Sequence, residues 1–163
     1  MLQVGNGFYT HNEELTHFAL WAFARAPLII GADLDKISNE SLAILKNKEL
    51  ISINQNGFGS QALCVEGCEL SPSNKFHIYQ VLVQSDITVK MAVIIVNWDD
   101  SETLNVDYDP IKHSVAFQTT DSCTYEDVYG NSTKSFQTDA TPYTFKDIEP
   151  HFHEAFYIKC LPW

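Results

Sequence analysis

The sequence predicts two unlike parts in one chain: an α/β segment over residues 1–56, followed by an antiparallel β-sandwich over residues 57–163. In the first part, helix-like and strand-like spacings of apolar residues alternate. In the second part, short runs of β-branched and aromatic residues are separated by turn residues, as in all-β domains. The polar turn Asn54–Gly57 lies where one pattern replaces the other, and we therefore place the domain boundary there.

The first part contains a predicted helix over Thr10–Arg25, which Thr10 or Asn12 can cap and Pro27 ends. Its apolar residues follow the three- and four-residue spacing of one helix face: Leu15, Phe18, Ala19, Ala22 and Ala26. The continuous apolar run Leu28–Ile30 comes next, and it is typical of a parallel strand that is covered on both faces.

A second helix is predicted to run from Ser38 or Asn39 through Leu45, with an acidic residue near its start and lysines near its end. Leu50–Ile53 is predicted to be a short closing segment before the polar turn. The first part is thus predicted to be strand, helix, strand, helix. Two parallel strands alone leave open sheet edges and an exposed apolar helix face, so we expect an incomplete barrel whose earlier elements precede this unit.

The second part contains seven predicted strands, whose turn-bounded runs suggest an antiparallel sandwich. The predicted strands cover residues 76–83, 88–97, 103–108, 115–118, 123–129, 143–148 and 155–160. Apolar and polar residues alternate clearly in Leu104–Tyr108, as expected for a sheet with one face in water.

The charge of the chain limits its partners. The sequence has 21 acidic and 10 basic residues, for a formal charge of −11. A surface that negative repels phosphate backbones and anionic lipids, so we expect neither nucleic acid nor a membrane surface as a partner. No apolar run approaches the roughly 20 residues that a membrane-spanning helix needs.

Two features bear on the compartment and point in different directions. The first residues lack the basic and apolar stretches of a signal peptide, which alone would favour the cytosol. Against this, four cysteines and two acceptor sequons, at Asn39 and Asn131, favour a secretory route with N-glycosylation.

The four cysteines are predicted to form two disulfides in an oxidising compartment. Cys64 and Cys68 enclose three residues, which excludes the usual zinc or redox spacing but permits a small loop disulfide. We predict the bonds Cys64–Cys68 and Cys123–Cys160, the second of which would join two strands of the sandwich. The alternative is four reduced thiols.

Two other groups of polar side chains could indicate a catalytic residue or a metal site, and we predict neither. Asp33 follows an apolar strand, where barrel loops carry out chemistry, but with Asp35 it is predicted instead to open the next loop and hold backbone N–H groups. His151 and His153 can start a metal site on one strand face. No third ligand is identifiable, so we predict two solvent-facing histidines on an edge strand and no metal.

Three segments carry a resemblance to a known family: Met1–Gly7, His17–Asp33 and Asn47–Gln55. The first is similar to a family strand with the pattern Asp-Met-Leu-x-x-Gly-Asn. The second resembles the helix and last barrel strand that follow, and the third resembles the family's Asn-Lys-Glu and Ile-Asn-Gln runs. The chain therefore resembles the C-terminal part of the melibiase family of α-galactosidases, glycoside hydrolase family 27. Residues 61–163 resemble only the outline of the family's C-terminal sandwich.

The resemblance implies that residues 1–56 are the last two βα units of a (β/α)8 barrel and that residues 57–163 are the β-sandwich behind it. It implies a full-length enzyme that removes terminal α-linked galactose with retention and without a cofactor. Such enzymes use two carboxyl groups about 5 Å apart. In this family both are aspartates on earlier strands, and no segment here matches them. No catalytic residue is therefore assigned, and we expect the isolated chain to be inactive.

The resemblance also implies a role for Met1, which matches a methionine of the family's galactose pocket and is predicted to give apolar contact to the sugar. We expect the chain to be a fragment, or the product of a truncated gene model, of a secreted, lysosomal or vacuolar enzyme. An α-N-acetylgalactosaminidase of the same family is an alternative. A non-catalytic carbohydrate-binding or structural module is another, with Trp98 and Trp163 as candidate exposed rings. The oligomeric state is not predicted.

Overall fold

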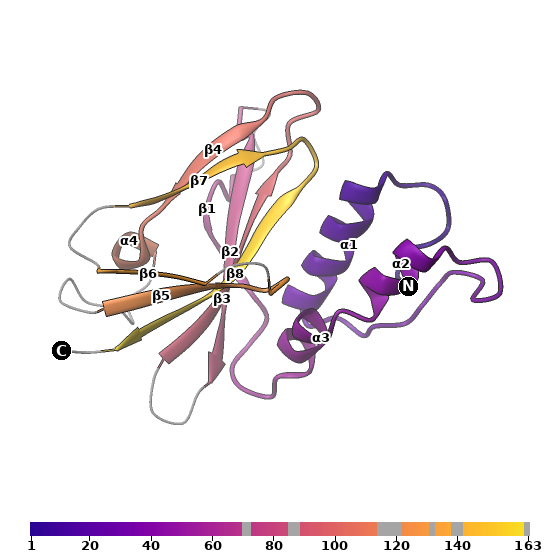
Figure 1. The fold of residues 1–163 in the computed structure, drawn as a ribbon, viewed down its shortest axis with the longest axis horizontal. Coiled ribbons are helices and arrows are strands. Elements are labelled where there is room, and N and C mark those ends of the chain that lie inside the picture. Colours follow the sequence, from indigo (N-terminus) through magenta and orange to yellow (C-terminus); the bar gives the residue numbers. More distant parts are fainter. Residues whose placement is uncertain (70–72, 85–88, 114–121, 131–132, 138–141, 162–163) are drawn as a thin grey trace.

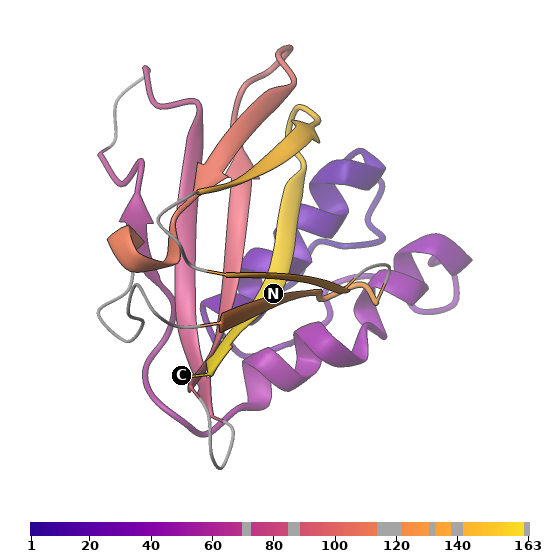
Figure 2. The same ribbon diagram turned by 60° about the vertical axis from the view of Figure 1, so that its left-hand side comes forward.

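The computed structural model describes residues 1–69, 73–84, 89–113, 122–130, 133–137 and 142–161. Three helices lie together on one side of a six-stranded antiparallel sheet, and a pair of strands lies on the other side (Figures 1 and 2). The helices are α1 (His11–Phe23), α2 (Asn39–Leu45) and α3 (Lys48–Gln55), and a fourth, α4 (Pro110–His113), connects two strands. None of the helices in the described residues is long and apolar enough to cross a membrane.

The strands of the large sheet run in the order β1-β2-β3-β8-β5-β6, and β4 pairs with β7 in the small sheet. Their bounds are β1 (Leu63–Glu66), β2 (Phe76–Gln84), β3 (Val89–Asn97), β4 (Leu104–Tyr108), β5 (Ser122–Asp127), β6 (Thr133–Gln137), β7 (Tyr143–Ile148) and β8 (His153–Leu161). Neighbouring strands are antiparallel in both sheets. The predicted antiparallel sandwich is therefore present, and helices cover its outer face.

Side chains cap each of the three N-terminal helices. Thr10 accepts a hydrogen bond from the Glu13 backbone N–H, and the Glu13 carboxylate accepts from the Thr10 N–H at 2.7 Å, which completes a capping box. The side chain of Ser38, one of the two predicted caps, accepts from Ser41 N and begins α2. The side chain of Asn47 accepts from Leu50 N at 3.0 Å and begins α3.

The prediction for Leu50–Ile53 was wrong, because these residues lie in α3 rather than in a short closing segment. Leu50 and Ile53 are three residues apart, so a helix places both on one face, and both are fully buried. The Asn47 cap supplies the start signal that the sequence reasoning overlooked.

The two strands predicted in the first part are reduced to one parallel bridge between Leu2 and Ile30. Leu2 N donates to Ile29 O at 2.8 Å, and Gly31 N donates to Leu2 O at 2.9 Å. A Cβ atom on Gly31 would lie 2.6 Å from Leu2 O, so only glycine permits this close approach of the two backbones.

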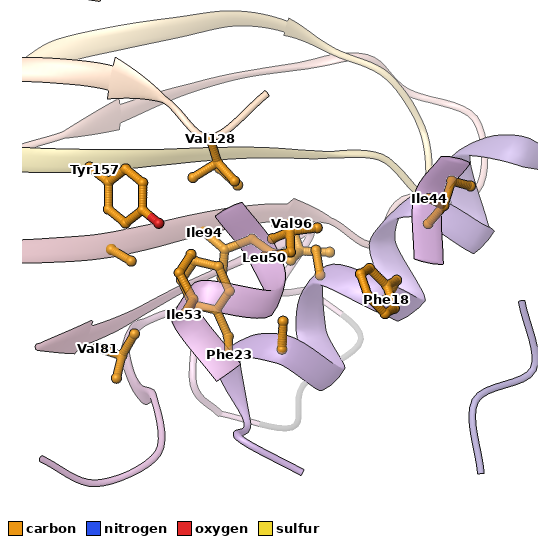
Figure 3. Close-up of a cluster of buried hydrophobic side chains, with 14 of the residues drawn as sticks. Phe18, Phe23, Ile44, Leu50, Ile53, Val81, Ile94, Val96, Val128 and Tyr157 are labelled. Atoms are coloured by element: carbon orange, nitrogen blue, oxygen red, sulfur yellow. The ribbon is translucent and has the colours of Figure 1, made fainter. Parts of the chain in front are cut away.

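Two apolar cores lie on the two faces of the large sheet. One lies between the helices and the sheet (Figure 3). Its members include Phe18, Phe23, Leu50 and Ile53 of the helices and Ile94, Val96 and Tyr157 of the sheet. The other joins the opposite face to β4 and β7, among them Met91, Val93, Ile95, Tyr108, Ile148 and Phe156. The helical part and the strand part thus share a buried core, although the sequence pattern changes between them.

Two described strands, β1 and β6, were not predicted, and the predicted strand over 115–118 lies outside the described residues. β1 has only four residues and none of them is fully buried, so its apolar pattern is weak. β8 begins at His153, two residues before the predicted start.

The structure contains a disulfide between Cys64 and Cys68. Cys123 is also disulfide-bonded, and its register partner across the β5–β8 pair is Cys160, whose side chain lies outside the described part of the chain. The pairing of Cys123 with Cys160 remains a prediction.

We predict that the oxidised chain contains two disulfides and no free thiol. Alkylation under denaturing, non-reducing conditions should leave the mass unchanged, whereas alkylation after reduction should modify all four cysteines. Digestion of the oxidised chain should give a peptide that joins Cys123 to Cys160. A Cys123 peptide alkylated without reduction would contradict the second bond.

Candidate functional site

The candidate site is the surface around the parallel Leu2–Ile30 bridge, where two loops begin. Met1 is 69% exposed there, and Ile29 and Leu34 are exposed as well. The loop Gly5–Gly7 follows the first strand segment, and residues 31–33 follow the second. Loops that follow neighbouring parallel strands lie at the same end of a sheet, which is where α/β folds bind ligands.

A buried carboxylate holds the first loop. Glu14 of α1 is only 6% exposed, and its Oε1 accepts from Gly5 N at 2.7 Å. Its Oε2 accepts from the Ser41 hydroxyl of α2, also at 2.7 Å. Gly5 has a φ of +87°, and a Cβ there would lie 2.6 Å from Ile37 Cγ1. Glu14 therefore fixes a loop conformation that requires glycine.

Sequence reasoning missed Glu14, although a signal was present. Glu14, Phe18 and Ala22 are spaced by four residues and share one helix face, which is buried. A carboxylate on an apolar helix face must be hydrogen-bonded to be tolerated there. That position marks Glu14 as a structural acceptor rather than as a surface charge.

His17 holds the residues before the loop. Its Nε2 accepts from Gln3 N at 3.2 Å, and its ring lies between Tyr9 and Trp21 at centroid distances of 5.5 and 5.0 Å. Burial, with a contribution from the N-terminal ammonium, lowers the pKa of His17. The ring is therefore neutral near pH 7 and carries its proton on Nδ1.

His153 is the most deeply buried polar group between α1 and the sheet, with 1% exposure. The Thr16 hydroxyl donates to His151 O at 2.9 Å, so it must accept the Nδ1–H of His153, also at 2.9 Å. His153 Nε2 is then the acceptor for the Tyr129 hydroxyl at 2.5 Å. This network joins α1, the residues after β5 and the start of β8.

The prediction of two solvent-facing histidines on an edge strand was wrong. β8 lies between β3 and β5 in the interior of the sheet, so His153 points into the core beneath α1. His151 precedes the strand in a left-handed conformation with a φ of 56°. No group of three or more metal-ligating side chains was found among the residues that the structure describes.

The structure places the remaining predicted residues as follows. Asp33 is exposed, pairs with Lys36 and accepts from Asp35 N at 3.1 Å, which is the loop-opening role predicted for it. Asn39 is exposed at the start of α2, whereas Asn131 lies outside the described residues. Trp98 is 39% exposed, and Trp163 lies outside the described residues.

Comparison with known proteins identifies relatives for both parts of the chain. The family model described as "Alpha galactosidase A" matches residues 1–56. "Alpha-galactosidase 3" of Arabidopsis thaliana is 31% identical over 140 residues, which cover 84% of this chain and 31% of that protein. "Alpha-galactosidase A" of Cellvibrio japonicus is 51% identical over 63 residues, which cover 39% of this chain and 15% of that protein.

Solved structures with the same fold include α-galactosidase I from Mortierella vinacea, with a TM-score of 0.81 and 23% identity, covering 97% of this chain and 38% of that one. The α-galactosidase of Saccharomyces cerevisiae with raffinose has a TM-score of 0.78 and 17% identity, covering 98% and 46%. The chain thus spans less than half the length of these relatives.

We predict that Glu14→Ala lowers the free energy of unfolding by about 2–3 kcal/mol, because it leaves the Gly5 N–H without its buried acceptor. Amide hydrogen exchange at Gly5 should accelerate more than in the core strands. Asp35→Ala is the matched control, since Asp35 is exposed and its side chain is expected to contribute less than about 0.5 kcal/mol. Equal losses in the two variants would contradict this role for Glu14.

We also predict that the folded chain becomes less stable as the pH is lowered, because of His153. Burial lowers the pKa of His153 to about 3, so below about pH 6.5 the unfolded chain binds this proton more tightly than the folded chain does. The contribution of neutral His153 is complete above pH 6.5 and decreases by up to about 1.4 kcal/mol per pH unit as pH falls.

The measurement is urea unfolding of the wild type and His153→Gln from about pH 7.5 to about pH 5.0, where the stability advantage of the wild type should shrink. Tyr129→Phe is the control, because it removes one hydrogen bond to the imidazole but keeps the titrating group. A difference in the free energy of unfolding between the wild type and His153→Gln that stays constant with pH would exclude the effect.

Proposed function

We propose that this protein, a relative of the melibiase family of α-galactosidases (glycoside hydrolase family 27), is the C-terminal part of a retaining enzyme that removes terminal α-linked galactose. The family match over residues 1–56 supports this proposal, as do the curated relatives, which are named α-galactosidases. The observation that carries it structurally is the parallel Leu2–Ile30 bridge, which lies at a surface with exposed apolar side chains.

We further propose that residues 1–56 are the last two βα units of a (β/α)8 barrel, and that residues 57–163 form the sandwich domain behind it. A parallel pair of two strands has unpaired backbone groups at both edges, and such strands are normally covered and extended by neighbours. Ile29, Ile30 and Leu34 are all more than 40% exposed around this pair. Their exposure fits a surface that further barrel elements would cover.

In this assignment the chain supports the active site but does not supply its acids. Active sites of (β/α)8 barrels lie at the C-terminal ends of the strands, where Gly5–Gly7 and residues 31–33 begin. Glu14 and His17 hold the first of these loops, and the exposed Met1 is the proposed apolar contact to the sugar. The nucleophile and the acid/base carboxyl would come from earlier barrel strands.

We also propose that the protein is made in the secretory pathway. The Cys64–Cys68 disulfide supports an oxidising compartment, and Asn39 is exposed at its sequon.

The proposed function is tested with the chain alone and with a chimera. The 163-residue chain should give no turnover of p-nitrophenyl α-galactoside. A chimera in which this chain replaces the matching region of Arabidopsis α-galactosidase 3 should fold and hydrolyse the substrate with retention. In the chimera, replacement of Met1 by Ala should raise KM about tenfold.

Leu63→Ala is the matched control, because Leu63 is similarly exposed but lies on β1, away from the parallel bridge. It should leave KM unchanged. Turnover by the isolated chain would show that its own carboxylates are catalytic, and a folded but inactive chimera would overturn the proposal.

A further inference from the structure

A cavity of about 220 Å³ lies where α1 meets the sheet. Its walls come from three separate parts of the chain: the loop before α1, one side of α1, and the turns that follow β3 and β7. The lining residues that matter here are Tyr9, Glu13, Thr16, His17, Trp98 and His151. Of these residues, His17 is the one used above for the proposed function, where it holds the backbone at Gln3.

The walls of the cavity are held in place by hydrogen bonds between distant segments. Thr16 binds both His151 O and His153 Nδ1, so α1 is tied to the turn before β8. Asn12 Nδ2 donates to Glu149 Oε2 at 2.9 Å and ties α1 to the same turn. The shape of the cavity is therefore set before any ligand enters, which lowers the entropic cost of binding.

Two aromatic rings are exposed at this cavity. Tyr9 is 40% exposed and Trp98 is 39% exposed. Trp98 is nevertheless fixed, because its backbone N–H donates to Lys75 O at 2.7 Å and its ring meets His77 edge-on at 5.8 Å. Ordered rings that remain in contact with solvent provide flat apolar surfaces for a ligand.

A hydrogen-bond acceptor and a hydrogen-bond donor lie beside the aromatic rings. Glu13 Oε2 accepts from Thr10 in the capping box, while Oε1 makes no hydrogen bond within the described part of the chain. The hydrogen bonds from Thr10 hold the pKa of Glu13 below its usual range, so it is a carboxylate at neutral pH. His17 accepts at Nε2 and so presents a donor at Nδ1. The cavity thus offers an acceptor and a donor beside aromatic faces.

We propose that this cavity binds one hexopyranose residue. A pyranose ring has an apolar C–H face that packs on aromatic rings and a rim of hydroxyls that donate and accept hydrogen bonds, which matches this lining. An anionic ligand is disfavoured by the Glu13 carboxylate and by Asp100, whose Oδ1 lies 3.3 Å from His151 Nε2. His151, which has a φ of 56°, also lines this cavity.

The test is a calorimetric or NMR titration of the 163-residue chain with methyl α-D-galactopyranoside and methyl α-D-glucopyranoside. We expect saturable binding of at least one of them with a Kd of about 1 mM. Trp98→Ala should weaken binding at least tenfold, to about 10 mM or more. Phe58→Ala is its matched control, because Phe58 is 41% exposed but lies outside the cavity, and it should leave the Kd unchanged.

Two further variants and one control guard against misfolding as an explanation. Glu13→Gln keeps the capping box, which accepts Gln at this position, but removes the carboxylate, and it should weaken binding about threefold or more. Tyr9→Ala should weaken binding, whereas Phe8→Ala, at the neighbouring and more exposed ring, should not.

Three outcomes would overturn the proposal. One is that neither glycoside binds. Another is that binding is unaffected by Trp98→Ala and Glu13→Gln. The third is that tetramethylammonium binds at the cavity more tightly than either glycoside, since aromatic rings beside a carboxylate also suit a cation. Loss of hydrolysis in the chimera described above would leave this binding result unchanged, so the two proposals fail separately.

Discussion

The α1 helix lies against β3 and β8 because alternate residues of those strands form an apolar face, and the rest of the molecule is arranged around that contact. Ala92, Ile94 and Val96 point toward the helices, while Met91, Val93 and Ile95 point toward the small sheet. The larger of these side chains each contribute about 1.5–3 kcal/mol to the free energy of unfolding when fully buried. A central strand that is covered on both faces couples the two cores, so the helices and the sandwich are expected to unfold together.

Apolar packing brings α1 to the sheet, but polar contacts fix where it lies along the strand. Thr16, His153 and Tyr129 form a chain of hydrogen bonds within the buried interface, and the donor and acceptor of each bond are identified. Each of these groups would be costly there without its partners, so shifting α1 by one turn is strongly disfavoured. The same network sets the position of Glu13 and His17, which face the loops and the cavity rather than the core.

Much of this fold could be predicted from local pattern, and the failures have physical reasons. β3 and β8 are long apolar runs and were predicted, as were the caps at Thr10 and Ser38, because side chain and backbone interact locally. β1 was missed because its residues are only partly buried. His153 was not recognised as buried, because its partner Thr16 lies 137 residues away in the sequence and no local pattern records such a contact. Glu14 has a local signal in its place on the apolar face of α1, but its partner Ser41, 27 residues away, could not be read from the sequence. Met1 was assigned to the sugar pocket from family motifs rather than from periodicity, and that assignment stays a prediction.

The sandwich acts on the candidate site through α1, which it holds in place. At the end of that helix, Arg25 adopts a φ of 52°, and its guanidinium donates to Phe58 O, Gly59 O and Leu82 O. These contacts attach the C-terminal end of α1 to β2 and to the segment that leads into the sheet, while His153 attaches its middle. Glu14 and His17 near the helix start are then held firmly enough to position the backbone N–H groups of Gly5 and Gln3. A helix anchored at its middle and end by a sheet transmits that rigidity to the loop at its other end. The β-sandwich can thereby determine the geometry of the candidate site.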